Sequence, residues 1–339
     1  MTTDIPLQTN LFRLSEIPDL ENIWRDLEDR SDSGFMLSWS WIGVWIKSQL
    51  NGLDPYVLKV TEKEKVVGLA VFVVKDIKIT RGVHAKCLHF HCTGDLDQDK
   101  VCIEYNNVLF EKGFGERGTQ SIINFLLEEK NFPKNVSGWE FLNFGMIAED
   151  DLRNFSHKNL LNWNASETST YGVDLTEFKV SDEGYLKHLS KNTRYQIRRS
   201  LRLYEERGPL EVNVAQSIDE ALSFFRDAGE YHKLRWEGDD DDGDYIGVEF
   251  SKFHETLIKE GFPRKEIDLI KITAGETCIG FLYNFIHKDV VYFYQCAFSY
   301  EDDKRLKPGL VSHYLGINKY ICDGKKCHDF MQAHGQYKN

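Results

Sequence analysis

The stretch Asp289–Asn339, at the C-terminal end of the sequence, restricts the possible folds more than any other. Its first segment, Asp289–Ser299, is rich in β-branched and aromatic residues, which is typical of a buried strand. A charged loop then leads to Pro308 and Gly309, which open a segment with helical periodicity. The last segment, Cys327–Ala333, again has the composition of a strand. The stretch therefore predicts the order strand, loop, helix, strand.

The start of this predicted helix has the chemistry of an anion site. The first backbone N–H groups of a helix lack partners within the helix, and the positive end of the helix dipole lies there. Lys304, Arg305 and Lys307 add cations beside Pro308 and Gly309. A pyrophosphate would fit this arrangement, and an ordinary surface turn with basic residues is the alternative.

The same order of elements occurs earlier in the chain. Val101–Phe144 has the pattern of strand, turn, helix and strand, and its closing strand resembles Cys327–Ala333. We interpret the repeat as a diverged internal duplication. A chain of 339 residues also exceeds the usual size of one core. Because segment 147–170 is polar and irregular, we expect an α+β protein with two domains, residues 1–160 and 161–339.

Composition excludes several classes of protein. A net charge of −12 and a pI near 5.4 argue against binding of bulk nucleic acid or anionic membrane. The seven cysteines form no C-x-x-C pair, so we expect reduced thiols and no metal site. The sequence shows no signal peptide and no apolar run of membrane-spanning length. These features predict a cytoplasmic protein without membrane insertion.

The most charged segment of the second half is Lys191–Arg207. Arg194, Arg198 and Arg202 are spaced four apart, so a helix would align them on one face. A solvated helix face is the simple interpretation. Because aligned arginines repel one another, binding of an anion is the alternative.

Several segments together resemble the CelD/BcsL-like acetyltransferases of the GNAT superfamily, which are relatives of the Fem-type aminoacyl and peptidyl transferases. They follow the order of that family over nearly the whole chain: Phe35–Trp45, Gly94–Asn107, Leu189–Arg202, Tyr231–Trp236, Gly275–Ile286, Phe298–Leu310 and Asp329–Lys338. Each motif is loose by itself, and the series is more specific. The resemblance implies two tandem GNAT-like domains, each a mixed, mostly antiparallel sheet flanked by helices, in agreement with the duplication.

The resemblance also implies a donor site in the C-terminal domain. In GNAT enzymes the loop before the third helix binds the pyrophosphate of acetyl-CoA through backbone amides. Here that loop carries a single glycine, and the pantetheine arm would lie between the splayed strands Asp289–Ser299 and Cys327–Ala333. The residues implied in donor binding are Gln295, Cys296, Ala297, Arg305, Lys307, Pro308, Gly309 and Leu310.

Attack of an amine or hydroxyl on a thioester needs a base, an oxyanion donor and an acid for the leaving thiolate. The candidate bases are Asp329, His232 and Glu104, and the candidate proton donors are Tyr294 and Tyr337. Asp329 stands in an otherwise apolar predicted strand, where a carboxylate must be paired or functional. For each candidate, hydrogen bonding in the core or capping of a helix is the alternative.

Four residues are expected to bind the acceptor or another anion: Arg194, Arg198, Arg235 and Trp236. We expect an acetyl-CoA-dependent N-acyltransferase, working without a metal on an amino sugar, a nucleotide-sugar or a surface-polysaccharide precursor. A Fem-type transferase that takes an aminoacyl group from tRNA is one alternative. A non-catalytic scaffold in polysaccharide assembly is another.

The expected partner is a small-molecule or glycan-precursor acceptor, with no nucleic acid except tRNA under the first alternative. The N-terminal domain is expected to lack a donor site, because its turn carries Glu111 and Glu116 beside Lys112 and Arg117. The sequence leaves open the acceptor, the choice between N- and O-acylation, and the oligomeric state.

Overall fold

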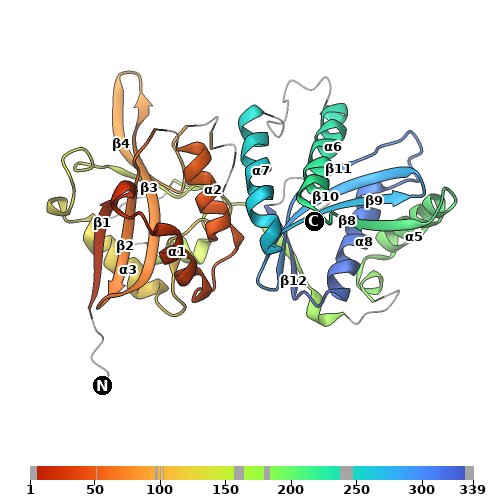
Figure 1. Ribbon diagram of the computed structural model, residues 1–339, viewed down its shortest axis with the longest axis horizontal. Coiled ribbons are helices and arrows are strands. Elements are labelled where there is room, and N and C mark those ends of the chain that lie inside the picture. Colours follow the sequence, from red (N-terminus) through yellow and green to blue (C-terminus); the bar gives the residue numbers. More distant parts are fainter. Residues whose placement is uncertain are drawn as a thin grey trace. The chain divides into compact units, whose positions relative to one another are not determined.

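The computed structural model describes residues 6–50, 52–95, 98–99, 101, 103–155, 164–178, 184–236 and 247–332, without the side chains of residues 129, 235 and 236. The chain divides into two compact units, Met1–Ala165 and Ser166–Asn339. Each unit contains one mixed β-sheet flanked by helices (Figure 1).

The N-terminal unit orders its main strands β1-β2-β3-β4-β6, with the short β5 paired to β3. All neighbouring pairs are antiparallel except β4 and β6, which are parallel. Its strands are β1 (Leu7–Arg13), β2 (Tyr56–Glu62), β3 (Lys65–Thr80), β4 (Val83–Phe90), β5 (Leu109–Phe110) and β6 (Phe141–Asn143). Its helices are α1 (Leu20–Asp29), α2 (Trp39–Gln49), α3 (Gly115–Leu126) and α4 (Glu149–Asn154).

The C-terminal unit orders its strands β7-β12-β11-β10-β9-β8. The pair β11 and β12 is parallel, and the other pairs are antiparallel. Its strands are β7 (Thr170–Asp174), β8 (Leu210–Val214), β9 (Ile267–Ala274), β10 (Thr277–His287), β11 (Val290–Phe298) and β12 (Cys327–Gln332). Its helices are α5 (Lys191–Glu205), α6 (Ile218–Trp236), α7 (Val248–Gly261) and α8 (Pro308–Cys322).

The two units share one order of elements: a strand, two helices, three strands, a helix and a strand. The N-terminal unit adds the short β5 before α3 and adds α4 at its end, and the C-terminal unit adds β7 and α5 at its start. Both sheets are mixed and mostly antiparallel, and their single parallel pair is closed by a crossover helix, α3 or α8. The predicted fold class is therefore confirmed, and the common origin of the two units stays a prediction. The predicted C-terminal helix also begins where expected, with Pro308 in its first turn, and Gly324 follows its end with φ of +71°.

One predicted element was wrong. The strand expected over Val101–Phe110 is reduced to β5, and the counterpart of β11 in the N-terminal unit is β4. Tyr105 has a positive φ and Asn106 is fully buried, so this segment is a buried loop with the composition of a strand.

Candidate active site

Strand β10 separates the two faces of the C-terminal sheet, because successive side chains of a strand point to opposite sides. Phe281 and Tyr283 contact the α6 side chains Phe224 and Phe225, with ring centroids 6.0 and 5.8 Å apart. Asn284 points the other way and donates a 2.9 Å hydrogen bond to Tyr320 Oη of α8. Helices α6 and α7 therefore cover one face, and α8 covers the other.

The parallel strands β11 and β12 separate soon after they begin. They pair only from Val290 to Tyr292 and from Cys327 to Asp329, although both strands continue. The register between β10 and β11 shifts at the same place, leaving Tyr294 as the extra residue of a bulge. Bulges redirect a strand and often lie beside active sites. The backbone that follows the bulge, from Gln295 onward, thus lies where the hydrogen-bond ladder between β11 and β12 has stopped.

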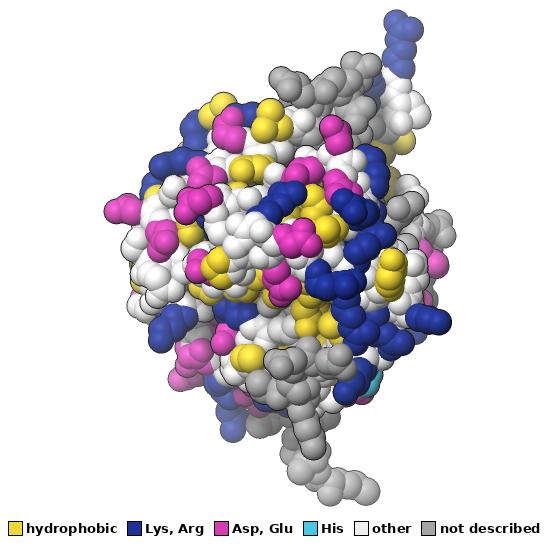
Figure 2. Space-filling view, turned by 90° about the vertical axis from the view of Figure 1, so that its right-hand side faces the viewer, with side chains coloured by type: hydrophobic (Ala, Val, Ile, Leu, Met, Phe, Trp, Pro, Cys, Tyr) yellow, Lys and Arg dark blue, Asp and Glu magenta, His cyan; other side chains and the backbone are white. Residues whose placement is uncertain are grey.

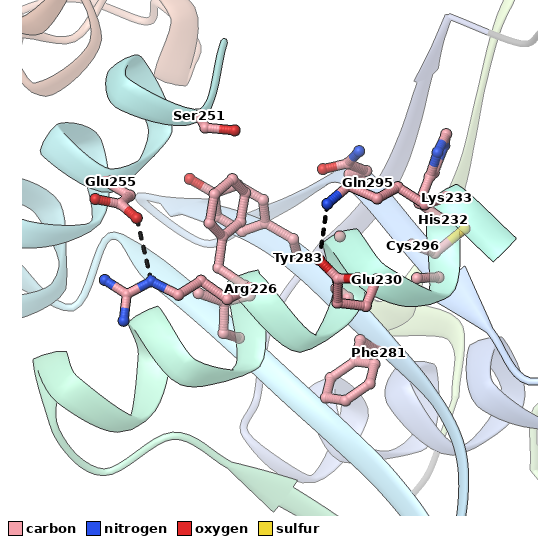
Figure 3. Close-up of a pocket in the computed structure, with 15 residues that line it drawn as sticks. Arg226, Glu230, His232, Lys233, Ser251, Glu255, Phe281, Tyr283, Gln295 and Cys296 are labelled. Atoms are coloured by element: carbon pink, nitrogen blue, oxygen red, sulfur yellow. Dashed lines mark hydrogen bonds and ion pairs between the residues drawn. The ribbon is translucent and has the colours of Figure 1, made fainter. Parts of the chain in front are cut away.

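A cavity of about 170 Å³, the α6–α7 cavity, opens beside this backbone (Figure 3). Two ion pairs lie among its side chains: Arg226 Nε to Glu255 Oε1 at 3.2 Å, and Lys233 Nζ to Glu230 Oε1 at 2.8 Å. Its lining comprises Phe225, Arg226, Ala228, Gly229, Glu230, His232, Lys233, Ser251, Glu255, Leu269, Phe281, Tyr283, Gln295, Cys296 and Ala297. Four predicted site residues are thereby brought together: His232, Gln295, Cys296 and Ala297.

A second cavity, the α8 pocket, has a volume of about 520 Å³. It lies among α5, α8, β7 and β12, and Leu310 is the predicted donor-binding residue in its lining. The lining comprises Tyr171, Gly172, Val173, Tyr185, His188, Leu189, Ser190, Thr193, Ile197, Leu310, His313, Tyr314, Ile317 and Phe330. Because α8 and the α6–α7 pair cover opposite faces of the sheet, the two cavities flank the parting strands from two sides.

The start of α8 is held by α5. The backbone N–H of Lys307, the N-cap residue, donates a 2.9 Å hydrogen bond to Oγ of Ser200, which is fully buried. Pro308 and Gly309 are also buried. Arg305 binds the carboxylate of Asp303, with the shortest contact at 2.7 Å, and this ion pair lowers the pKa of Asp303 to about 2. Since exposed ion pairs are weak, an anionic ligand could compete for Arg305.

Helix α5 lies on a side of the C-terminal unit where basic side chains gather. Figure 2, a view onto the right-hand side of Figure 1 where α5 lies, shows Lys and Arg side chains gathered into a band. Arg198 and Arg202 are exposed, and Arg194 donates a 2.7 Å hydrogen bond to the carbonyl oxygen of Lys187. Their role in binding an anion stays a prediction. The side chains of Arg235 and Trp236 lie outside the described residues.

The other predicted catalytic residues are spread over the molecule. Asp329 is half-buried and accepts a 2.6 Å hydrogen bond from the backbone N–H of Met331, a local contact within β12. The hydroxyl of Tyr294 lies 3.0 Å from Nε2 of His254. Glu104 belongs to the N-terminal unit, and Tyr337 lies outside the described residues. Their catalytic roles stay predictions.

Glu230, Glu255 and Tyr283 are among the lining residues that the sequence analysis missed. Glu230 lies two residues before His232, a separation that does not indicate a shared helix face, so helical spacing gave no signal for it. Glu255 and Tyr283 reach the cavity only through the packing of α7 on β10, which gives no local signal.

The corresponding gap in the N-terminal unit is closed by Asn106. Its amide donates hydrogen bonds to the carbonyl oxygens of Phe90 and Phe144, at 2.8 and 2.7 Å. These residues directly follow the paired parts of β4 and β6, and their rings stack 4.7 Å apart. The Oδ1 atom of Asn106 lies 2.8 Å from Nδ1 of His91. In the N-terminal unit a polar side chain thus bridges β4 and β6. The equivalent strands of the C-terminal unit, β11 and β12, separate at this position.

A comparison with known families found a match within the C-terminal unit. Residues 191–339 match the family described as an acetyltransferase (GNAT) domain. This part of the chain is therefore similar to a GNAT acetyltransferase domain. The expected enzyme class, an acyltransferase, is thereby confirmed, and domains of this type generally use acyl-CoA as the donor. A comparison with curated protein sequences found no match.

Several solved structures resemble the whole chain. FemX is 11% identical with a TM-score of 0.57, over 94% of this chain and 89% of that one. The C-terminal domain of a putative lysylphosphatidylglycerol synthetase from Agrobacterium fabrum is 9% identical with a TM-score of 0.53, over 92% and 77%. A conserved protein of unknown function from Bacteroides thetaiotaomicron is 10% identical with a TM-score of 0.52, over 94% and 90%. At these identities the similarity shows the fold alone.

Metal sites and membrane-spanning helices can be assessed for the described residues. No group of three or more His, Cys, Asp or Glu side chains there is arranged to hold a metal ion. None of the helices in those residues is both long and apolar enough to cross a membrane.

Proposed function

We propose that the GNAT domain transfers an acetyl group from acetyl-CoA to an amino group, with donor and acceptor meeting beside Gln295–Ala297. The observation that carries this proposal is the interrupted ladder of β11 and β12, bulged at Tyr294 and flanked by a cavity on each face. Two substrates can approach one strand edge from opposite sides there. The narrower resemblance to CelD/BcsL-like acetyltransferases is part of this proposal.

The donor would bind on the α8 side. The first-turn amides of α8, at Gly309 and Leu310, would hold the pyrophosphate, with Lys307 and Arg305 as counter-charges. The pantetheine arm would follow the gap to the backbone of Gln295, Cys296 and Ala297. Leu310 supports this assignment, because it lies in the first turn of α8 and also lines the α8 pocket.

The acceptor would occupy the α6–α7 cavity. There the amine nitrogen attacks the thioester carbon, the C–S bond breaks, and the amine proton passes to a base while the CoA thiolate takes up a proton. His232 is our first choice of base because it is the predicted base that lines this cavity, and Glu230 and Glu255 are carboxylates in the same lining. A positioned base contributes about 10²–10⁴-fold to the rate.

We propose an amino sugar, a nucleotide-sugar or a surface-polysaccharide precursor as the acceptor, acylated in the cytoplasm. The carboxylates of Glu230 and Glu255 suit an ammonium group, and Arg226 and Lys233 suit an anionic one. We also propose that the N-terminal domain binds no donor, since Asn106 bridges its strands.

A Fem-type transfer from aminoacyl-tRNA is the second candidate. The basic band on the α5 side and the similarity of fold to FemX favour it. A scaffold role without catalysis is the third.

The test is release of CoA thiol from acetyl-CoA in the presence of amino sugars and nucleotide-linked amino sugars. We expect turnover with at least one of them and a loss of about 10²–10⁴-fold in His232→Ala. The exposed and neighbouring Leu234→Ala, outside the cavity lining, is the matched control and should keep its rate. Binding of charged tRNA without acetyl-CoA turnover would support the second candidate, and binding of neither would support the third.

A further inference from the structure

A buried histidine lies directly beneath the α6–α7 cavity. The inward stripe of α7 consists of buried residues at helical spacing: Phe250, Phe253, His254, Leu257, Ile258 and Gly261. His254 is fully buried, and the ring of Phe250 lies 4.2 Å from its own, centroid to centroid. A polar ring in such a stripe needs hydrogen-bond partners, because an unsatisfied buried polar group is costly.

Two tyrosines supply these partners. Oη of Tyr283, on β10, lies 3.3 Å from Nδ1 of His254, and Oη of Tyr294, on β11, lies 3.0 Å from Nε2. Burial lowers the pKa of His254 to about 3, so the ring is neutral near pH 7 and has one N–H donor and one acceptor nitrogen. One tyrosine therefore donates to His254 and the other accepts from it.

One tyrosine lines the α6–α7 cavity, and the other lies at the bulge of β11. Tyr283 lines the α6–α7 cavity, and Tyr294 is the extra residue of the β11 bulge. Gln295, Cys296 and Ala297, which follow the bulge, line the same cavity. The bond from His254 to Tyr294 thus ties helix α7 to the residue that redirects β11.

We infer that His254 is a positioning residue: through Tyr294 it holds the β11 bulge, and so sets the backbone of Gln295–Ala297 at the place of acyl transfer. The inference rests on the proposed function for the identity of the ligand. It means that a side chain of α7 determines the backbone conformation of β11, the strand that the donor would contact.

The two bonds of His254 can be removed separately. The amide of glutamine reaches about as far as Nε2, and that of asparagine about as far as Nδ1, so His254→Gln keeps a partner for Tyr294 and His254→Asn keeps one for Tyr283. Tyr294→Phe and Tyr283→Phe form a second matched pair. Each variant is first tested by urea denaturation, so that a loss of function is compared among folded proteins only.

The first readout is the Kd for acetyl-CoA by titration calorimetry. We expect His254→Asn and Tyr294→Phe to raise Kd about tenfold or more, the loss of about one buried hydrogen bond. His254→Gln and Tyr283→Phe should stay within about threefold of the parent protein. Equal Kd values for His254→Asn and His254→Gln would overturn the inference.

The second readout needs no acetyl-CoA. The rate at which N-ethylmaleimide alkylates Cys296, followed by peptide mass spectrometry, reports on the backbone after the bulge. We expect this rate to change at least fivefold in His254→Asn and Tyr294→Phe, and not in His254→Gln. If the parent protein fails to bind acetyl-CoA, the proposed function fails and the alkylation rates alone decide the inference. An unchanged rate in Tyr294→Phe would refute it.

Discussion

Acid should destabilise the C-terminal unit well before its carboxylates titrate. Burial lowers the pKa of His254 and of His328 to about 3, and both side chains are at least 99% buried. In the unfolded chain a histidine has a pKa of about 6.5. Between pH 6.5 and 3 the unfolded state therefore binds more protons than the folded one. Stability is complete above this window and falls as the pH falls through it.

The size of the effect follows from the linkage relation. Each such histidine contributes about 1.4 kcal/mol per pH unit inside the window, or about 2 kcal/mol between pH 6.5 and 5. Two of them lower the free energy of unfolding of this unit by about 4 kcal/mol, a large share of ordinary domain stability.

Urea denaturation at pH 7 and pH 5, followed by hydrogen exchange of peptides from α7 and β12, measures this loss. The variant His328→Phe replaces one titrating ring by an apolar ring and should halve the pH dependence. Equal stability of the parent protein at pH 7 and pH 5 would refute the assignment of these two histidines as buried and neutral.

Three other substitutions have defined outcomes. Asn106→Ala removes three side-chain hydrogen bonds and should lower the unfolding free energy of the N-terminal unit by about 3 kcal/mol or more, as tryptophan fluorescence would show, without changing acetyl-CoA binding. Ser200→Ala leaves the N–H of Lys307 without its acceptor, so it should lower the unfolding free energy by about 1–3 kcal/mol in urea denaturation and raise the Kd for acetyl-CoA. An unchanged Kd would show that this hydrogen bond does not affect donor binding. Gly280→Ala would place its methyl group 2.7 Å from the carbonyl oxygen of Ala297, so we expect a cost of about 1–3 kcal/mol and slower turnover, and full activity would show that this backbone tolerates displacement.

The sequence predicted those strands and helices that have a clear local pattern of residues. The strand composition of Asp289–Ser299 and the helix start at Pro308 correspond closely to β11 and α8. The same reasoning misassigned Val101–Phe110, because a buried loop and a buried strand share an apolar composition. The positive φ of Tyr105 and the hydrogen bonds of Asn106 mark this segment as a loop.

The roles of the candidate site residues stay predictions. The backbone at Gln295–Ala297 was named from a family resemblance, and these residues line the α6–α7 cavity. The bulge at Tyr294 and its bond to His254 depend on how α7 packs on the sheet, so neither has a signal in the order of residues. Asp329 was singled out as an isolated carboxylate, and a backbone N–H two residues away is the partner that reasoning could not foresee.

The most direct test of the account is a calorimetric titration of acetyl-CoA into the protein. We predict one site per chain with micromolar Kd, lost when Lys307→Glu and Gly309→Asp are combined at the start of α8. Lys325→Glu, which changes a charge just beyond the opposite end of α8, should leave Kd unchanged. A folded protein that binds neither acetyl-CoA nor longer acyl-CoAs, or one whose binding survives the double substitution, would contradict the proposed donor site.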